Sequence, residues 1–260
     1  MRFIIIALIL LFYHPVNAKV KKINVPMSDM PMKAIESPNS KVNLIMFVGG
    51  PGLKHGKLGK VKNPLIRAKS IFKQSGANLY FFPNPKKGKA MKLSHRISRK
   101  HADNILKVSK IVKKRNNLPT ILVGHSRGGT SVSNAAVVHG AKIDGIVNAA
   151  AMTTTSSKVS SKHIITKILK KGVDTHILIV HPKKDTCLVT PYRPLPKLMK
   201  NLKAKSKKLV TVNGGGTTGR ECGPLHRHGF ENTEKELANS IINWASGSVS
   251  YTHLTLPTKA

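Results

Sequence analysis

The sequence of 260 residues predicts an α/β fold built on a mostly parallel, doubly wound sheet. Short apolar runs rich in Val, Ile and Leu recur along the chain, and patterns typical of helices lie between them. The runs are apolar at successive positions rather than at every second one, as expected for strands that are buried on both faces. No internal repeat or low-complexity linker interrupts this alternation, so a single domain is expected.

Six apolar runs are interpreted as buried strands, and five segments as helices. The strands are expected at residues 42–48, 78–82, 121–123, 145–150, 175–180 and 208–212, and the helices around residues 102–114, 130–139, 161–171, 195–202 and 233–244. The connection over residues 151–174 is only about one helix long, so no separate cap domain is expected.

The most informative segment is Gly-His-Ser-Arg-Gly at residues 124–128, where an apolar run ends and a small-residue helical pattern begins. Gly-x-Ser-x-Gly between a strand and a helix is the pattern of a nucleophile elbow, a turn so tight that Gly124 and Gly128 must lack side chains. Ser126 is therefore the predicted nucleophile, in a strained backbone conformation. Because a helix follows, the backbone N–H of Arg127 is a predicted oxyanion donor.

A serine nucleophile needs a base and a carboxylate that orients the base. In an open α/β sheet both should lie in loops after the carboxyl ends of strands. Asp185 follows the expected strand at residues 175–180, whereas Asp144 and Asp174 precede strands and should lie at the opposite edge. Asp185 is therefore the predicted acid.

The predicted base lies in the glycine-rich loop that follows the expected strand at residues 208–212. This loop carries two histidines, His226 and His228. We choose His228, because its His-Gly-Phe turn directly before the last helix would fix the imidazole, and keep His226 as the alternative.

The chain order Ser126, Asp185, His228 is that of the α/β-hydrolases. From the first core strand to the last helix the chain resembles small, capless, exported bacterial members of that family. The resemblance implies a Ser-His-Asp triad that cleaves a small-molecule ester or thioester through an acyl-enzyme, with no cofactor and no metal. One departure is that no clear pair of strands precedes residue 42, so a sheet of fewer than the family's eight strands is expected.

The resemblance also assigns two features around the triad. It implies a disulfide between Cys187 and Cys222, which would tie the acid loop to the base loop; an even cysteine count in an exported chain favours a disulfide as well. It further implies a second oxyanion donor in the glycine-rich loop at residues 47–52. Gly50 is the predicted donor, but the neighbouring Pro51 has no N–H, which leaves the identity of the donor within this loop open.

Both ends of the sequence are interpreted as outside the domain, which we place at residues 19–248. Residues 1–18 are typical of a secretory signal peptide, with a basic residue, an apolar run and a small residue at the end. A periplasmic or secreted protein without a transmembrane segment after signal removal is therefore expected. Residues 249–258 match a translated transposon-type sequencing adapter residue for residue, so the tail at residues 249–260 is interpreted as an artefact.

The charge is strongly unbalanced, with 45 Lys and Arg against 10 Asp and Glu and a formal net charge of +35. The lysines occur in every segment, which favours a solvated surface over a dedicated site, with at most weak association with anionic surfaces. Few aromatic residues accompany the densest basic stretch, residues 86–100, so no specific nucleic-acid binding is predicted. The alternative function is an inactive hydrolase scaffold that binds anionic surfaces or polymers.

Two other readings of the sequence are weaker. A phosphate-binding loop near residues 49–57 is excluded, because Pro51 stands where the pattern requires its first glycine. A metal site formed by His181, His226 and His228 would lack suitably spaced thiolates and a carboxylate beyond Asp185.

Overall fold

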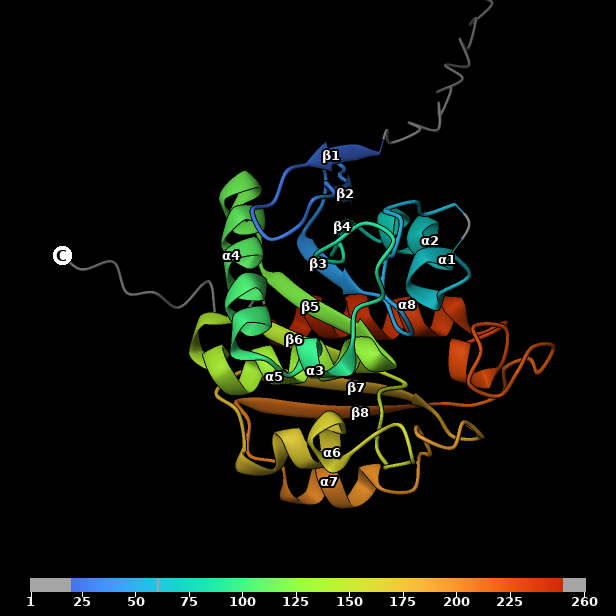
Figure 1. Ribbon diagram of the computed structural model, residues 1–260. Helices are drawn as coiled ribbons and strands as arrows, with labels where there is room; N and C mark the ends of the chain where they lie inside the picture. Colours follow the sequence, from blue (N-terminus) through green and yellow to red (C-terminus); the bar gives the residue numbers. More distant parts are fainter. Residues whose placement is uncertain (1–19, 60, 250–260) are drawn as a thin grey trace, which may run out of the picture.

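The computed structural model describes residues 20–59 and 61–249. The predicted signal peptide and residues 250–260 of the predicted tail lie outside this part of the chain. At the centre is an eight-stranded sheet with the strand order β1-β2-β4-β3-β5-β6-β7-β8 (Figure 1). The strands β4, β3, β5, β6, β7 and β8 run parallel, and β2 pairs antiparallel with both β1 and β4. The mostly parallel sheet predicted from the apolar runs is confirmed.

The strands agree with the six expected runs to within a few residues and add two more. They are β1 (Lys21–Ile23), β2 (Met32–Ile35), β3 (Val42–Phe47), β4 (Ala77–Phe81), β5 (Thr120–His125), β6 (Gly145–Ala149), β7 (His176–Pro182) and β8 (Ser206–Val212). The expectation of fewer than eight strands is therefore wrong. Both additional strands are short and contain lysine, and the side chains of Lys21 and Lys22 are exposed, so neither forms a recognisable apolar run.

The helices lie on both faces of the sheet. They are α1 (Pro64–Arg67), α2 (Lys69–Gln74), α3 (Leu93–Arg96), α4 (Arg99–Asn116), α5 (Arg127–His139), α6 (Ile165–Ile168), α7 (Leu195–Asn201) and α8 (Glu234–Trp244). The helix expected at residues 161–171 is broken into α6 and two flanking 3₁₀ turns. The break occurs because Ile164 is extended and the next N–H bonds to the carbonyl of Met152.

An apolar core lies on each face of the sheet, between the sheet and the helices that cover it. One core packs α1, α2 and α8 against one face, and the other packs α4 to α7 against the opposite face. In β3, Leu44 and Met46 belong to the first core while Ile45 and Phe47 belong to the second, so every second side chain faces the same layer. Burial of each such side chain stabilises the fold by about 1.5–3 kcal/mol. This sandwiched sheet is the rigid base on which the loops at its carboxyl edge are held.

The connection between β6 and β7 forms no cap domain. It contains α6 and the two 3₁₀ turns, and its apolar residues Met152, Val159 and Ile164 form a small cluster with Leu93 and Val189. The site at the carboxyl edge is thus left without a lid of its own in the described part of the chain. None of the described helices combines the length and the apolar character needed to cross a bilayer.

Candidate active site

Ser126 occupies the turn between β5 and α5 in a conformation that L-residues rarely adopt. Its φ is 53° and its ψ is −119°. Such a conformation costs about 1–3 kcal/mol and persists only where surrounding bonds hold it. Here the N–H of Ser126 donates to the carbonyl of Ala149 at 3.0 Å, and its own carbonyl accepts from the N–H of Gly129 at 2.9 Å. The strained serine expected from the sequence is therefore present.

The two glycines of the motif are needed for steric reasons. A Cβ on Gly124 would overlap the backbone carbonyl of Gly128, and a Cβ on Gly128 would overlap the carbonyl of Phe47 at the end of β3. The first contact closes the elbow itself, and the second brings the start of α5 against the neighbouring strand. The glycine spacing therefore fixes both the turn and its position beside the loop that follows β3.

That glycine-rich loop passes directly beside Ser126. A Cβ on Gly49 would lie 2.9 Å from the Cβ of Ser126, so the loop backbone is in close contact with the serine. Gly50 follows with a φ of +54° and lines the same cavity as Ser126. Arg127 is the first residue of α5, where backbone N–H groups have no partner within the helix. The segments that carry the two predicted oxyanion donors, the loop after β3 and the start of α5, thus both adjoin Ser126.

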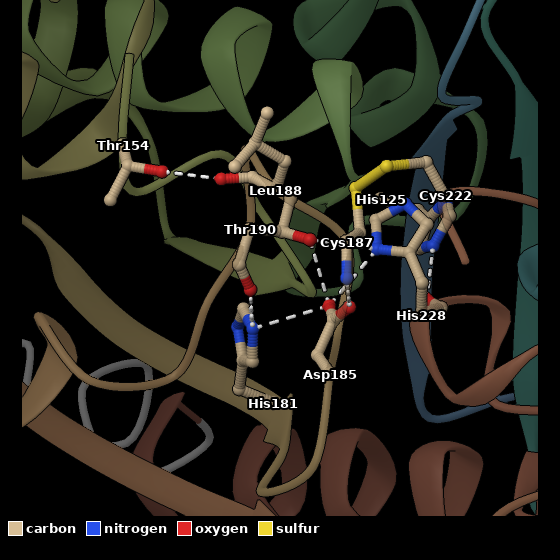
Figure 2. The surroundings of a disulfide bond; sticks show 9 residues. All are labelled: His125, Thr154, His181, Asp185, Cys187, Leu188, Thr190, Cys222 and His228. Carbon is tan, nitrogen blue, oxygen red and sulfur yellow. Dashed lines mark hydrogen bonds and ion pairs between the residues drawn. A yellow bond between two sulfur atoms is a disulfide. The ribbon is translucent and has the colours of Figure 1, made fainter. Parts of the chain in front are cut away.

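His228 and Asp185 are in direct contact, although 43 positions separate them in the sequence (Figure 2). The distance from His228 Nδ1 to Asp185 Oδ2 is 3.0 Å, and both side chains are almost fully buried. An ionised carboxylate can only accept, so Nδ1 carries the proton and Nε2 is left as a lone-pair acceptor. His228 and Ser126 line one cavity of about 830 Å³. The structure therefore gathers the three predicted triad residues at one site.

The carboxylate of Asp185 is held by its own loop as well. Its Oδ1 accepts from the N–H of Cys187 at 2.9 Å, and its Oδ2 accepts from the hydroxyl of Thr190 at 2.8 Å. Burial raises the pKa of Asp185, but the interactions with His181 and His228 outweigh it and hold the pKa well below its usual range. Asp185 is therefore ionised over the whole range in which a histidine could act as a base.

His181 and Thr190 complete this buried polar cluster. His181 Nε2 donates to the carbonyl of Thr190 at 2.7 Å and lies 3.5 Å from Asp185 Oδ2. The hydroxyl of Thr190 also lies 3.0 Å from His228 Nδ1. Thr190 was missed by the sequence analysis, because a lone threonine five positions after an aspartate carries no signal. Its hydroxyl contacts both members of the His–Asp pair.

His125, the second residue of the elbow motif, fixes the backbone of the base loop. Its Nε2 donates to the carbonyl of His228 at 3.0 Å, which requires the other nitrogen, Nδ1, to accept from the amide of Asn63 at 3.0 Å. Burial, reinforced by the neighbouring His228, lowers the pKa of His125 to about 3, so this ring is neutral. No pattern in the sequence predicts a role for either His125 or Asn63.

His226, the alternative base, is buried on the same loop. Its carbonyl accepts the N–H groups of Gly229 and Glu231, and its Nδ1 has no hydrogen-bond partner within the described residues. The carboxylate of Asp185 bonds to His228 instead. The geometry therefore favours the choice of His228 made from the turn that follows it.

A disulfide joins Cys187 to Cys222 and so links the acid loop to the base loop (Figure 2). The donor atoms of Asp185, Cys187 and His228 lie within 4.8 Å of one another, a spacing that would suit a metal ion. However, the sulfur of Cys187 is bonded to another sulfur and is not a thiolate ligand. This cluster is accordingly a cross-linked His–Asp pair rather than a metal centre.

Arg96, which the sequence analysis did not single out, is buried behind the glycine-rich loop. Its guanidinium donates to the carbonyls of Val48 at 3.1 Å and Gly50 at 3.4 Å, and to the hydroxyl of Ser131 in α5 at 3.1 Å. Burial, with a smaller effect of the nearby Arg127, lowers its pKa to about 9. Arg96 therefore carries its charge at neutral pH and ties the loop beside Ser126 to α5.

Comparisons with known proteins place this arrangement in a structural class. No protein-family model matches the sequence, and no curated protein matches it either. Solved structures do match over nearly the whole chain. Dienelactone hydrolase from Anabaena variabilis is 12% identical, with a TM-score of 0.57 and coverage of 88% of this chain and 97% of that chain.

Two further solved structures agree with this match. Est1E from Butyrivibrio proteoclasticus is 15% identical with a TM-score of 0.59, and the match covers 89% of this chain and 99% of that chain. A Xanthomonas campestris protein described as an α/β serine hydrolase without a lid is 14% identical with a TM-score of 0.54, and the match covers 95% of this chain and 99% of that chain. Together with the sheet order and the elbow, these matches show that the chain has the α/β-hydrolase fold.

Proposed function

We propose that this protein is a serine hydrolase that cleaves a carboxylic ester or thioester through an acyl-enzyme intermediate. The observation that carries the proposal is the combination of a strained Ser126 and a His228 whose Nδ1 is held by Asp185, both lining one cavity. An ordinary serine in a surface turn has neither the strain nor a buried histidine–carboxylate pair beside it. The names of structural neighbours, among them a dienelactone hydrolase and a serine hydrolase without a lid, agree with this chemistry.

In the proposed mechanism the first half-reaction acylates the serine. His228 Nε2 takes the proton of the Ser126 hydroxyl as Oγ attacks the carbonyl carbon of the ester. The resulting oxyanion accepts hydrogen bonds from the N–H of Arg127 and from the loop at Gly50. The tetrahedral intermediate then collapses, and the alcohol or thiol leaves with the proton that His228 returns.

The second half-reaction regenerates the free enzyme. A water molecule gives its proton to His228 Nε2 while its oxygen attacks the acyl carbon on Ser126. Collapse of this intermediate releases the acid and returns the proton to the Ser126 oxygen. Throughout, Asp185 keeps its negative charge and stabilises the imidazolium. Its low pKa suits that role, since the carboxylate does not take up the proton.

We further propose that the protein works outside the cytoplasm. The signal-peptide pattern at residues 1–18 and the disulfide between Cys187 and Cys222 both support an oxidising, periplasmic or secreted location. Detection of the mature protein in the periplasmic or culture fraction, with its new N-terminus at Lys19, would test this part of the proposal.

The chemical proposal is tested first with a fluorophosphonate probe, which labels activated serines, and an intact-mass readout. We expect one adduct on the parent protein and none on Ser126→Ala, whose turnover of a 4-nitrophenyl ester should fall to below about 1% of the parent rate. The Tm should change little, because the side chain lost is a single hydroxyl. No adduct on the folded, oxidised parent would refute the proposal and favour a scaffold that only binds anionic surfaces.

A further inference from the structure

The mouth of the Ser126 cavity is surrounded by basic side chains. Five lysines and arginines line it, from three segments that are distant in the sequence: Lys54, Lys57, Lys62, Lys87 and Arg220. No aspartate or glutamate is among the described lining residues. All but Lys54, which is half-buried, are exposed, so their charged ends are available to a molecule that enters the cavity.

These five charges are not neutralised by the protein. Within residues 20–59 and 61–249, none of them forms an ion pair with a carboxylate, whereas Arg67, Lys113 and Arg115 elsewhere on the chain do. Two acids approach the mouth without lining it. Asp29 accepts the backbone N–H of Lys87, and Glu221 adjoins Arg220 in the sequence. The mouth therefore has a net positive charge.

Apolar side chains also line the cavity, together with Ser126 and His228. Among them Val48 is buried and Val61 is half-buried, whereas Pro51 and Pro224 are exposed. Low-dielectric walls concentrate the field of nearby charges, so the basic residues act more strongly on a molecule in the cavity than isolated surface lysines would. The cavity thus combines the candidate nucleophile Ser126, apolar side chains and a cluster of cations.

We propose that the substrate is an ester that carries an anionic group, a carboxylate or a phosphate, at the end of an apolar chain. The ester would lie at Ser126, the chain along the apolar wall and the anion among the five basic side chains. This proposal rests on the ester hydrolysis proposed above and specifies the substrate class of the same site.

The test compares two esters of the same shape that differ in charge. Mono-4-nitrophenyl adipate has a free carboxylate, and methyl 4-nitrophenyl adipate has the same chain with that carboxylate masked. At low ionic strength we expect kcat/KM for the anionic ester to be at least about tenfold higher, mainly through a lower KM. The preference should shrink toward unity in about 1 M salt, where the Debye length is about 3 Å.

Two variants of equal net charge separate the mouth from the general excess of lysine. The mouth variant combines Lys57→Gln, Lys62→Gln, Lys87→Gln and Arg220→Gln; the distal control combines Lys170→Gln, Lys171→Gln, Lys197→Gln and Lys200→Gln, at exposed positions next to α6 and on α7. The mouth variant should lose the preference, leaving a ratio below about twofold, and the distal control should retain it. An equal loss in both variants would attribute the effect to overall charge and overturn the proposal.

Inhibition experiments on the hydrolysis of the neutral ester distinguish whether the site prefers a carboxylate or a phosphate. Hexanoate and hexyl phosphate represent the two anions, and hexanol is the uncharged control. We expect both anions to inhibit at concentrations at least about tenfold lower than hexanol, and the stronger of the two to identify the favoured group. Equal inhibition by all three would contradict an anion site.

Failure of this proposal can be told apart from failure of the proposed function. If the neutral ester is hydrolysed in a Ser126-dependent manner but the anionic ester is not preferred, only the substrate class is wrong. If neither ester is hydrolysed and no fluorophosphonate adduct forms, the hydrolase function falls and the substrate class falls with it.

Discussion

At the scale of single residues, Arg96 combines an unfavourable environment with a position next to the site. The residue is 1% exposed, its guanidinium has no carboxylate partner among the described residues, and its Nε has no hydrogen-bond partner there either. Burial of an unpaired charge opposes folding by several kcal/mol. Two of its hydrogen bonds nevertheless hold the carbonyls of Val48 and Gly50, in the loop that contacts Ser126. Arg96 is therefore best understood as a positioning residue for that loop.

We expect Arg96→Met to lower kcat on a neutral ester by about tenfold to a hundredfold with little change in KM, because a small displacement of an oxyanion donor weakens only transition-state binding. The Tm should fall by no more than a few degrees or even rise, since the buried unpaired charge is removed. Steady-state kinetics and thermal unfolding measure the two effects on the same sample.

Two variants control this experiment. Arg99→Met removes an exposed arginine three positions away that pairs with Asp103, and should change neither kcat nor Tm noticeably. Arg96→Lys keeps a charge that can reach one carbonyl and should recover part of kcat. A large fall in Tm with kcat intact would show that Arg96 serves the fold and not the loop.

At the scale of elements, the candidate site consists of separate loops that are joined by one covalent bond. The Cys187–Cys222 disulfide closes a sequence separation of 35 residues. In the chain-entropy model such a cross-link stabilises a fold by about 4 kcal/mol. Because Cys187 lies two residues after Asp185 and Cys222 lies six before His228, the bond also restrains the distance between acid and base.

The double variant Cys187→Ala, Cys222→Ala should therefore unfold at a Tm lower by several degrees and should lose part of kcat. Reductant should produce the same two changes in the parent protein and have no effect on the double variant. Mass spectrometry without reductant should find the two cysteines in one cross-linked peptide. Two freely alkylatable thiols in the protein purified without reductant, or a parent that is insensitive to reductant, would contradict this prediction.

The helices and strands differ in how well the sequence predicts them. The strands β3 to β7 were predictable because burial on both faces demands continuous apolar runs, and the elbow was predictable because sterics demand glycine at positions 124 and 128. The edge strand β8, expected as a buried strand, is in fact largely exposed or half-buried, and only Val212 in it is buried. The strands β1 and β2 and the helices α1 to α3 are too short to show the periodic pattern of apolar residues by which a strand or a helix is recognised. Contacts such as those of Asn63 with His125 depend on tertiary packing and leave no local signal.

At the scale of the whole molecule, the buried histidines make stability depend on pH. His101 and His125 are almost fully buried, and their burial lowers both pKa values, that of His125 to about 3 and that of His101 well below its usual range. Both rings therefore bind a proton less readily in the folded protein than a free histidine does. In the unfolded chain a histidine binds a proton below about pH 6.5. Below that pH, proton binding thus favours the unfolded chain.

The difference between the folded and unfolded pKa values determines in which direction, and over which pH range, the stability changes. Stability from a lowered histidine pKa is complete above pH 6.5 and is lost as the pH falls below it, by up to about 1.4 kcal/mol per pH unit for each histidine. The carboxylates with lowered pKa values, Asp185, Asp103, Glu36 and Glu231, add their losses only near and below the unfolded values of 3.8 for Asp and 4.5 for Glu. The interval from pH 6.5 to 5 therefore reports mainly on the histidines.

We expect the free energy of unfolding by urea to decrease steadily from pH 6.5 to 5 in the parent protein. His101→Gln should have a shallower slope over this interval whatever its absolute stability, because one buried ring with a lowered pKa no longer takes up a proton on unfolding. His55→Gln, at an exposed position, should leave the slope unchanged. Equal slopes for His101→Gln and the parent would mean that the His101 ring is already protonated in the folded state. The ring, which hydrogen-bonds to Ser131 and packs edge-on against Phe82, would then be a buried cation next to Arg96. The loss of hydration on burial opposes such a charged ring.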